Sequence, residues 1–396
     1  MRFLALLLII LSLFNITIAQ SLEKVSPEEV GLNSSILLKA DSVINKVIEN
    51  KIIPGAVLLV ERFNKIAYHK AFGYRELVPE KKPMELNTIF DLASITKPVA
   101  TATSVMILLE RGSLRLKDPV SLFIHDFKQY KGEFSDKPIR IIHLLTHTSG
   151  LPPYAPVKEL KEKFKGPQPD SLIHYIATVE RHHAPGTYFK YSCLNFITLQ
   201  RIVKIISGKS IKEFSEQNIF KRLGMKNTFF TPPEEKIQFC AATEQLEDGQ
   251  VLLGKVHDPL AREINNCISG NAGLFSTAED LAIYSAMMLN KGSWNGQRIL
   301  SPLTVQKMIT VPKGFEEFGR ALGWDLYSPY NSNLGDLFSA KAFGHTGYTG
   351  TSIAIDPEYQ IAVILLTNRV HPHDKGSVVR LRSLIANIVA ASIIKK

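Results

Sequence analysis

A serine and a lysine lie three residues apart at the start of an apolar segment, FDLASITKPVATATSVMILLERG, which begins at Phe90. On a helix this spacing places Ser94 and Lys97 on one face. A serine becomes a nucleophile when a neighbouring group takes its proton, and burial in apolar surroundings lowers the pKa of a lysine enough for that task. Free backbone N–H groups at a helix N-terminus also suit an oxyanion. The pair therefore indicates nucleophilic catalysis, although a capping serine followed by a surface-reaching lysine has the same spacing.

Further motifs support the catalytic interpretation. A Tyr191-Ser192 pair follows a Pro-Gly turn in APGTYFKYSCLNF, and a His-Thr-Gly triplet precedes a strand in FGHTGYTGTSIAIDP. Two phrases of distinctive composition, IRIIHLLTHTSGLP (139–152) and GNAGLFSTAEDLA (270–282), accompany them. In this order and at these separations the motifs resemble the serine β-lactamase and penicillin-binding-protein superfamily, specifically its branch of class C β-lactamases, DD-peptidases and related esterases. The resemblance extends from about residue 31 to residue 390.

The resemblance implies a role for each motif residue. Ser94 would be the nucleophile that carries the acyl group, and Lys97 its partner in proton transfer. Tyr191 would share the proton transfer and activate the deacylating water. The edge strand of the site would bind substrate, and the backbone N–H groups of Ser94 and Tyr348 would form the oxyanion hole. The substrate-binding residues implied in this way are His345, Thr346, Gly347 and Tyr348.

Two positions depart from the pattern of that superfamily. Cys193 stands where the motif Tyr-x-Asn has its amide, and Asn195, two residues further on, is expected to be structural. His345 stands where the triplet usually has lysine, and a histidine is mostly neutral at pH 7. Both changes weaken the expectation of efficient penicillin turnover while leaving acyl-enzyme chemistry intact. Cys193 is expected either to pack in the interior or to make the enzyme sensitive to alkylation at the rim of the site.

Other suggestive residues are better explained by structure. The run SGKS (207–210) lacks the earlier glycine of a phosphate-binding loop. The run HPHD (371–374) has too few ligands for a metal site. His143 and His147 are expected to pack and form hydrogen bonds within a helical domain. The sequence therefore predicts neither a cofactor nor a metal ion.

The periodicity of apolar residues places these motifs on helices and strands. Residues 34–51, 196–207 and 211–222 have helical spacing, and GAVLLVER and KIAYHKAFGY read as a hairpin around Asn64. In STAEDLAIYSAMMLNKG, Ser276 and Glu279 are spaced as a capping box. The strands SIAIDP and IAVILLTN precede a final amphipathic helix over 377–393.

This order predicts an α/β fold in which both chain ends build an antiparallel sheet flanked by helices, interrupted by a mostly helical domain. That is the architecture of the β-lactamase and transpeptidase enzymes that the motifs resemble. The predicted division is a signal peptide at 1–19, α/β parts at 20–112 and 270–396, and the helical insertion at 113–269.

Composition bounds the class of protein and its partners. The chain has 396 residues, 45% hydrophobic and 21% charged, which is typical of a globular protein. MRFLALLLIILSLFNITIA reads as a signal peptide cleaved after Ala19, with an uncleaved anchor as the alternative. We expect a secreted or periplasmic protein without a stable membrane span. The net charge of +10 is spread along the chain, which favours contact with an anionic cell envelope over nucleic acid. The three cysteines leave at least one free thiol and cannot form a disulfide framework.

The sequence thus predicts an exported serine hydrolase that acts through an acyl-enzyme on Ser94. Its expected substrates are small-molecule or peptide amides and esters that resemble the D-alanyl peptides of cell walls, hydrolysed by a β-lactamase-like or D-alanyl-D-alanine carboxypeptidase-like enzyme. A carboxylesterase of the same fold is the first alternative. A non-catalytic binding module of the envelope is the second.

Overall fold

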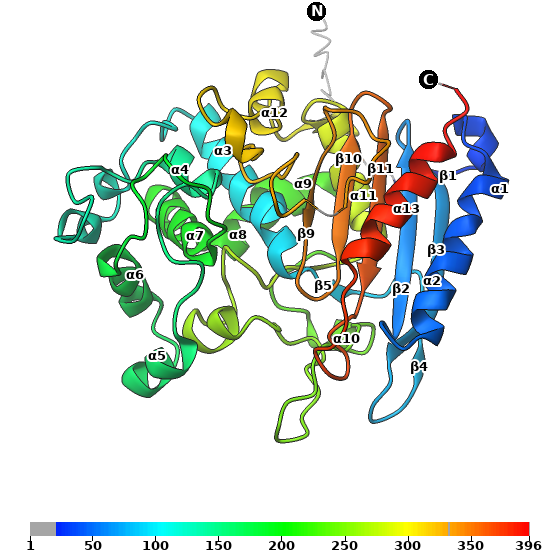
Figure 1. Cartoon of the computed structure of the whole chain (residues 1–396), viewed down its shortest axis with the longest axis horizontal. Coiled ribbons are helices and arrows are strands. Elements are labelled where there is room, and N and C mark those ends of the chain that lie inside the picture. The colour runs from blue at the N-terminus through cyan, green and yellow to red at the C-terminus, as the bar shows by residue number, and fades with distance from the viewer. Residues whose placement is uncertain (1–20, 332, 396) are drawn as a thin grey trace, which may run out of the picture.

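The structure is a computed structural model that describes residues 21–331 and 333–395 (Figure 1). The predicted signal peptide at 1–19 lies outside the described residues. Within the described part of the chain, no helix combines the length and apolar character needed to cross a bilayer.

A seven-stranded sheet is assembled from both ends of the chain, in the order β1-β3-β2-β11-β10-β9, with β4 paired to β3. All its pairs are antiparallel except β1 with β3. The predicted hairpin turns through Phe63 and Asn64, both with positive φ. Its first strand lies beside a C-terminal strand, with Leu59 opposite Ile364. The sheet strands are β1 (Glu23–Lys24), β2 (Gly55–Arg62), β3 (Lys65–Glu76), β4 (Lys82–Pro83), β9 (Phe343–Thr346), β10 (Ser352–Asp356) and β11 (Ile361–Thr367).

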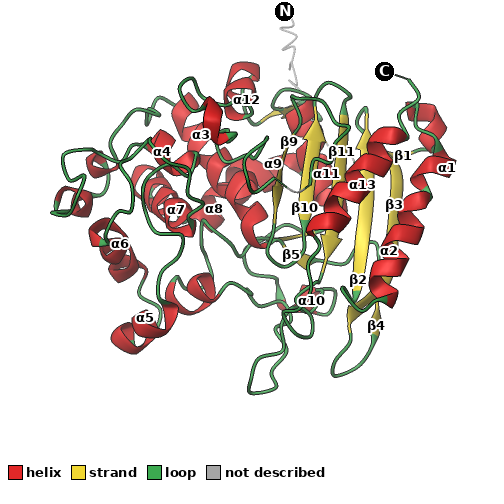
Figure 2. Cartoon of the chain, in the orientation of Figure 1, coloured by secondary structure: helices red, strands yellow, loops and turns green. Residues whose placement is uncertain are grey.

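Helices cover both faces of this sheet, as Figure 2 shows. On one face lie α1 (Ser34–Leu37), α2 (Lys39–Glu49) and α13 (Val379–Ala391), and on the other α11 (Ala278–Leu289). Because side chains alternate along a strand, Leu58 and Val60 of β2 pack under α1, α2 and α13, while Val57 and Leu59 pack on the face covered by α11. The predicted α/β fold, with a sheet from both chain ends between helices, is confirmed.

The segment between the two halves of the sheet is mostly helical, and its helices α4 to α8 lie to the left in Figure 1. It contains α4 (Ile141–Leu145), α5 (Val157–Phe164), α6 (Pro169–Thr178), α7 (Cys193–Ser207), α8 (Ile211–Ser215), α9 (Lys221–Leu223) and α10 (Glu234–Ile237). The remaining elements are α3 (Thr103–Glu110), α12 (Pro302–Met308) and the short strands β5 (Phe90–Asp91), β6 (Phe275–Ser276), β7 (Ser293–Trp294) and β8 (Gln297–Arg298). The exact domain boundaries at 112 and 269 stay a prediction.

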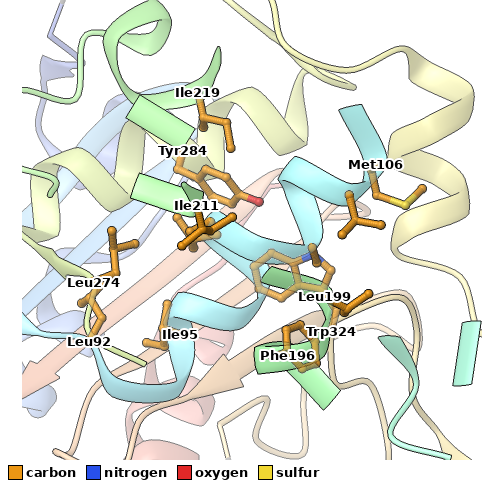
Figure 3. Close-up of a cluster of buried hydrophobic side chains, with 14 of the residues drawn as sticks. Leu92, Ile95, Met106, Phe196, Leu199, Ile211, Ile219, Leu274, Tyr284 and Trp324 are labelled. Atoms are coloured by element: carbon orange, nitrogen blue, oxygen red, sulfur yellow. The ribbon is translucent and has the colours of Figure 1, made fainter. Parts of the chain in front are cut away.

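A large buried cluster joins this helical part to the sheet, and Figure 3 shows its centre. Ile95 lies on the segment leading into α3, Phe196 on α7 and Leu274 just before β6, and all three are buried. At the same place the Thr103 hydroxyl and the Tyr284 phenol hydrogen-bond at 2.8 Å. The segment that carries Ser94 and Lys97 is therefore held between the two halves of the molecule.

Two local predictions need correction. The helix of Ser94 and Lys97 does form, but it begins with a 3-10 turn at Ala93–Ile95 and a π-helical stretch at Lys97–Ala102 before α3. The cap of α11 is Thr277, whose hydroxyl accepts from Asp280 N at 3.3 Å, and not Ser276. Ser276 belongs to β6, and its hydroxyl bonds Thr228 at 2.7 Å. Tertiary pairing of β6 moved the start of the helix by one residue.

Candidate active site

The turn that presents Ser94 is strained and tightly held. Ala93 has φ +46°, a left-handed conformation that is unfavourable for any residue with a Cβ. The buried carboxylate of Asp91 accepts from Ala93 N and from His257 N, both at 2.8 Å. Burial raises the pKa of Asp91, while these backbone donors oppose that rise. The strain is thus offset by bonds that fix where the Ser94 side chain points.

Lys97 is fully buried, and its ammonium nitrogen meets three groups. Nζ lies 2.9 Å from Ser94 Oγ, 2.8 Å from the carbonyl oxygen of Asn271 and 3.6 Å from Cys193 Sγ. The Tyr191 ring centroid is 5.0 Å away. The two residues that the sequence singled out are therefore in direct hydrogen-bond contact, and Tyr191 lies beside them.

The ionisation of Lys97 depends on these neighbours. Burial lowers its pKa, but negative charge on Cys193 and Tyr191 raises it more, so the pKa lies above its ordinary value. This rise requires ionised neighbours, and the lowering by burial that the sequence predicted is the largest single effect on Lys97. Burial also raises the pKa of the Cys193 thiol. At neutral pH the sulfur is therefore uncharged, and its raising effect on Lys97 is absent.

Tyr191 is stacked between two other rings. The His147 ring lies 4.3 Å from it and the Tyr330 ring 5.2 Å, with interplanar angles of 24° and 26°. His147 Nδ1 accepts from Ser192 N at 3.1 Å, so the same imidazole also holds the backbone after Tyr191. Burial holds the pKa of His147 well below its ordinary value, as do nearby Arg320 and Lys97. A neutral His147 therefore supports Tyr191 by packing and hydrogen bonding, as predicted.

The phrase HLLTHTSGLP positions the Tyr191 loop through further bonds. Lys190 N donates to His147 O at 2.9 Å, and Cys193 N donates to Pro153 O at 2.8 Å. Asn195 points back to this phrase, with its Oδ1 accepting from Ser149 Oγ at 2.6 Å. The structural role expected for Asn195 is confirmed.

The predicted edge strand lies directly against the Ser94 turn. Gly347 packs so closely that a Cβ there would lie 2.4 Å from the Leu92 carbonyl oxygen. Two threonines tie the same region down: Thr349 donates to Asp91 O at 2.7 Å and Thr351 to Leu92 O at 3.0 Å. Thr346 is half-buried at the end of β9. The four substrate-binding candidates, His345 to Tyr348, therefore line one wall of the Ser94 cleft.

His345 is buried and neutral in this wall. Burial holds its pKa well below the ordinary value, with the positive charges of Arg320 and Lys97 acting in the same direction. Its Nδ1 lies 2.9 Å from the Thr346 carbonyl and its Nε2 3.4 Å from Arg320 Nη2. Since a carbonyl only accepts, the proton is on Nδ1, and Nε2 faces the arginine.

The cleft itself contains charges that the sequence did not reveal. It has a volume of about 370 Å³, and three arginines line it together with Ser94 and Tyr191: Arg320, Arg369 and Arg382. Arg320 is buried and forms an ion pair with Asp325 at 3.0 Å. Arg382, on α13, donates to the Gly347 and Thr351 carbonyls at 2.7 and 3.0 Å. No motif marked these positions, because they become neighbours of Ser94 only through the sheet and α13.

Comparison with known proteins decides the family. The family model described as Beta-lactamase matches residues 40–387. The chain belongs to the beta-lactamase family. An N-acetylmuramyl-L-alanine amidase of Bacillus subtilis (strain 168) is 34% identical over 374 residues, 88% of this chain and 84% of that protein. A putative D-alanyl-D-alanine carboxypeptidase of Salmonella agona (strain SL483) is 32% identical over 378 residues, 87% of this chain and 85% of that protein.

The solved structure of EstCE1, a hydrolase with promiscuous acyltransferase activity, has the same fold. It aligns with a TM-score of 0.72 at 23% identity, over 90% of this chain and 99% of that one. The predicted membership of the serine β-lactamase and penicillin-binding-protein superfamily is confirmed, and this beta-lactamase-family protein is a serine hydrolase.

Two features of this family member concern its sulfur atoms. Cys193 is half-buried and its Sγ lies 3.6 Å from Lys97 Nζ, which agrees with the packing alternative. All three cysteines are free thiols, so Cys240 and Cys267 do not pair. Within residues 21–331 and 333–395, no three histidine, cysteine or acidic side chains gather closely enough to hold a metal ion.

Proposed function

We propose that the protein is an exported D-alanyl-D-alanine carboxypeptidase that forms an acyl-enzyme on Ser94. The observation that carries the proposal is the 2.9 Å contact between Ser94 Oγ and Lys97 Nζ, at the wall of a cleft lined by β9 and by arginines. A hydroxyl held against a buried amine is the arrangement that nucleophilic catalysis requires.

Each step of the reaction has a candidate residue. Ser94 Oγ attacks the carbonyl carbon of the scissile amide while its proton passes to Lys97 Nζ, and the C–N bond then breaks. Tyr191 lies against Nζ and passes a proton to the departing amine. Water, with Tyr191 as the base, then attacks the ester on Ser94, and as the C–O bond breaks Lys97 returns its proton to Ser94 Oγ. Backbone N–H groups of Ser94 and Tyr348 are proposed as the oxyanion hole.

The charge of the cleft favours a substrate with a carboxylate. The neutral His345 supplies no positive charge, but Arg320 lies 3.4 Å from its Nε2 and carries a permanent one. The departing D-alanine of a D-alanyl-D-alanine peptide has a carboxylate one carbon away from its amine. The two relatives are named for a D-alanyl-D-alanine bond and for an N-acetylmuramyl-L-alanine bond. A carboxylate so close to the leaving amine supports the first of these activities.

A carboxylesterase of the same fold is the second candidate. Cys193 stands in place of the amide expected in the Tyr-x-Asn motif, and its sulfur faces Lys97 rather than the cleft. A site without that amide binds a peptide less tightly, whereas a reactive ester is cleaved without tight binding. The contact of Ser94 with Lys97 argues against a non-catalytic envelope module, because a binding surface does not need it.

One experiment separates these activities. Benzylpenicillin is mixed with the wild type and with Ser94→Ala, and intact mass is followed together with hydrolysis. An adduct that persists on the wild type and is absent from the variant supports a carboxypeptidase with slow deacylation, while fast hydrolysis indicates a β-lactamase. The same proteins are then given an N-acylated D-Ala-D-Ala peptide and a p-nitrophenyl ester. Ester turnover that far exceeds release of D-alanine would favour the esterase, and no reaction of any kind would contradict the proposal.

Export rests on the sequence of residues 1–19. Expression of the full chain, followed by fractionation and N-terminal sequencing, should give a mature protein that begins at Gln20 outside the cytoplasm. An intact N-terminus retained in the membrane would support the uncleaved anchor instead.

A further inference from the structure

Cys193 is a half-buried nucleophilic group for which the proposed reaction has no step. It begins α7, two residues after Tyr191, and its Sγ lies 3.6 Å from Lys97 Nζ. The other two thiols face backbone carbonyls, Cys240 that of Lys236 at 3.7 Å and Cys267 that of Arg262 at 3.6 Å. Cys193 therefore occupies a different environment from the other cysteines.

The geometry around Nζ gives the sulfur a defined task. A lysine nitrogen is tetrahedral, with one bond to Cε and three other positions, and here three groups surround it: Asn271 O, Cys193 Sγ and Ser94 Oγ. The carbonyl oxygen can only accept, so one position of Nζ carries a hydrogen toward it. If the sulfur accepts a second hydrogen, the third position faces Ser94 Oγ.

In the neutral amine this third position is the lone pair, which is the acceptor that the Ser94 proton needs. Lys97 is fully buried, so an N–H group that lost the sulfur would have no solvent to turn to. The amine would then rotate to satisfy its hydrogens, and one of them would face Ser94 Oγ in place of the lone pair.

We propose that Cys193 is a positioning residue for Lys97, because its sulfur accepts one Nζ hydrogen and so directs the remaining Nζ position to Ser94 Oγ. The inference rests on the proposed acyl-enzyme function. It does not require the thiol to react. An uncharged sulfur suffices, in agreement with the burial that raises the pKa of Cys193.

Other groups also act on Lys97 and are unchanged in the test. Tyr191 and Asp258 raise the pKa of Lys97. Lys97 in turn lowers the pKa values of His147 and His345, together with burial and Arg320. A change confined to Cys193 therefore reports on the sulfur alone.

The test compares Cys193→Ala and Cys193→Ser with a matched control, Cys240→Ala. The rate constant for acylation of Ser94 is measured from the burst of p-nitrophenol release, between pH 5 and pH 10, with melting temperatures recorded for every protein. For Cys193→Ala we expect the plateau rate to fall about tenfold and the acid limb to move to lower pH, because an ammonium with one acceptor fewer loses its proton more easily. Cys193→Ser, whose hydroxyl still accepts, should stay within about threefold of the wild type with an unmoved limb. Cys240→Ala should match the wild type.

Each other outcome overturns the inference. An alanine variant with the plateau and acid limb of the wild type would show that the sulfur does not orient Lys97. A serine variant that falls as far as the alanine variant, at an unchanged melting temperature, would do the same, and it remains informative if the alanine variant fails to fold. A wild type that shows no burst and no Ser94 adduct would contradict the proposed function as well, which distinguishes the two failures.

Discussion

Arg320 offers the sharpest test of substrate choice, since it is the fixed positive charge beside the neutral His345. Its guanidinium is 1% exposed, pairs with Asp325 at 3.0 Å and lies 3.4 Å from His345 Nε2. A hydrogen bond to a charged group is worth about 1.5–3 kcal/mol. At about 1.4 kcal/mol per factor of ten, loss of the guanidinium should lower kcat/KM about ten- to hundredfold for a substrate whose carboxylate it binds.

A substitution of Arg320 alone would combine the loss of substrate binding with a loss of protein stability. It leaves Asp325, whose side chain is 7% exposed, as an unpaired buried charge, and breaking such a pair costs about 3–5 kcal/mol of stability. The double variant Arg320→Gln with Asp325→Asn replaces the ion pair by a pair of neutral amides and avoids that charge. Asp325→Asn alone is the control that keeps the positive charge of Arg320, and its melting temperature measures the cost of leaving that buried charge unpaired.

The assay uses two substrates with the same scissile bond, an N-acylated D-Ala-D-Ala peptide and its C-terminal methyl ester. The wild type and Asp325→Asn should prefer the free acid, and the double variant should lose that preference while it cleaves the ester almost as before. Melting temperatures check that the three proteins are folded. Equal losses on both substrates, or an unchanged preference in a folded double variant, would refute the assignment of Arg320 to the substrate carboxylate.

Three further predictions test the surroundings of the site. Gly347→Ala should lower kcat/KM about a hundredfold and reduce the melting temperature, because its Cβ would meet the Leu92 carbonyl oxygen at 2.4 Å and move the strand edge from Ser94 by a fraction of an ångström or more. A folded variant with full activity would contradict that close packing. His147→Asn removes the ring stacked on Tyr191, and asparagine tolerates the φ of +58° at this position. We expect kcat to fall about three- to tenfold with little change in KM. Steady-state kinetics in which only KM changed would disprove this. Burial lowers the pKa of His143 to about 4, so as pH falls from 7 to 4 the unfolded chain binds a proton that the folded protein does not. The wild type should therefore lose about 2–3 kcal/mol of stability relative to His143→Gln over this range. Urea unfolding of both proteins at both pH values measures this, and a stability difference between them that is the same at pH 7 and pH 4 would exclude it.

Local patterns were sufficient for much of the fold. The continuous apolar runs in GAVLLVER and IAVILLTN predicted strands that do pair side by side as β2 and β11, since residues facing two helical layers must be apolar on both faces. Helical spacing located α7 and α13 to within a few residues, and the helix predicted over 34–51 forms as two consecutive helices, α1 and α2. The start of the Ser94 helix was less predictable, because its 3-10 and π turns depend on what packs against them.

The sequence by itself determined the residues that a serine hydrolase of this family needs. Ser94 and Lys97 are three residues apart, so any helical turn brings them together, and the structure places their reactive atoms 2.9 Å apart. Tyr191 and the triplet starting at His345 were recognisable because each lies in a short motif of fixed order. Motifs of this kind are local, so they can be recognised from the sequence alone.

Only the tertiary structure decided the electrostatics of the site. Arg320 and Arg382 join the cleft from elements that carry no motif, and the pKa of Lys97 depends on the charge of partners about a hundred residues away in the chain. Cys193 could be read as a missing amide, but not as a sulfur held against Nζ. Charges and hydrogen bonds act through space over a few ångströms, so their effect on a catalytic group follows from the folded arrangement and not from the order of residues.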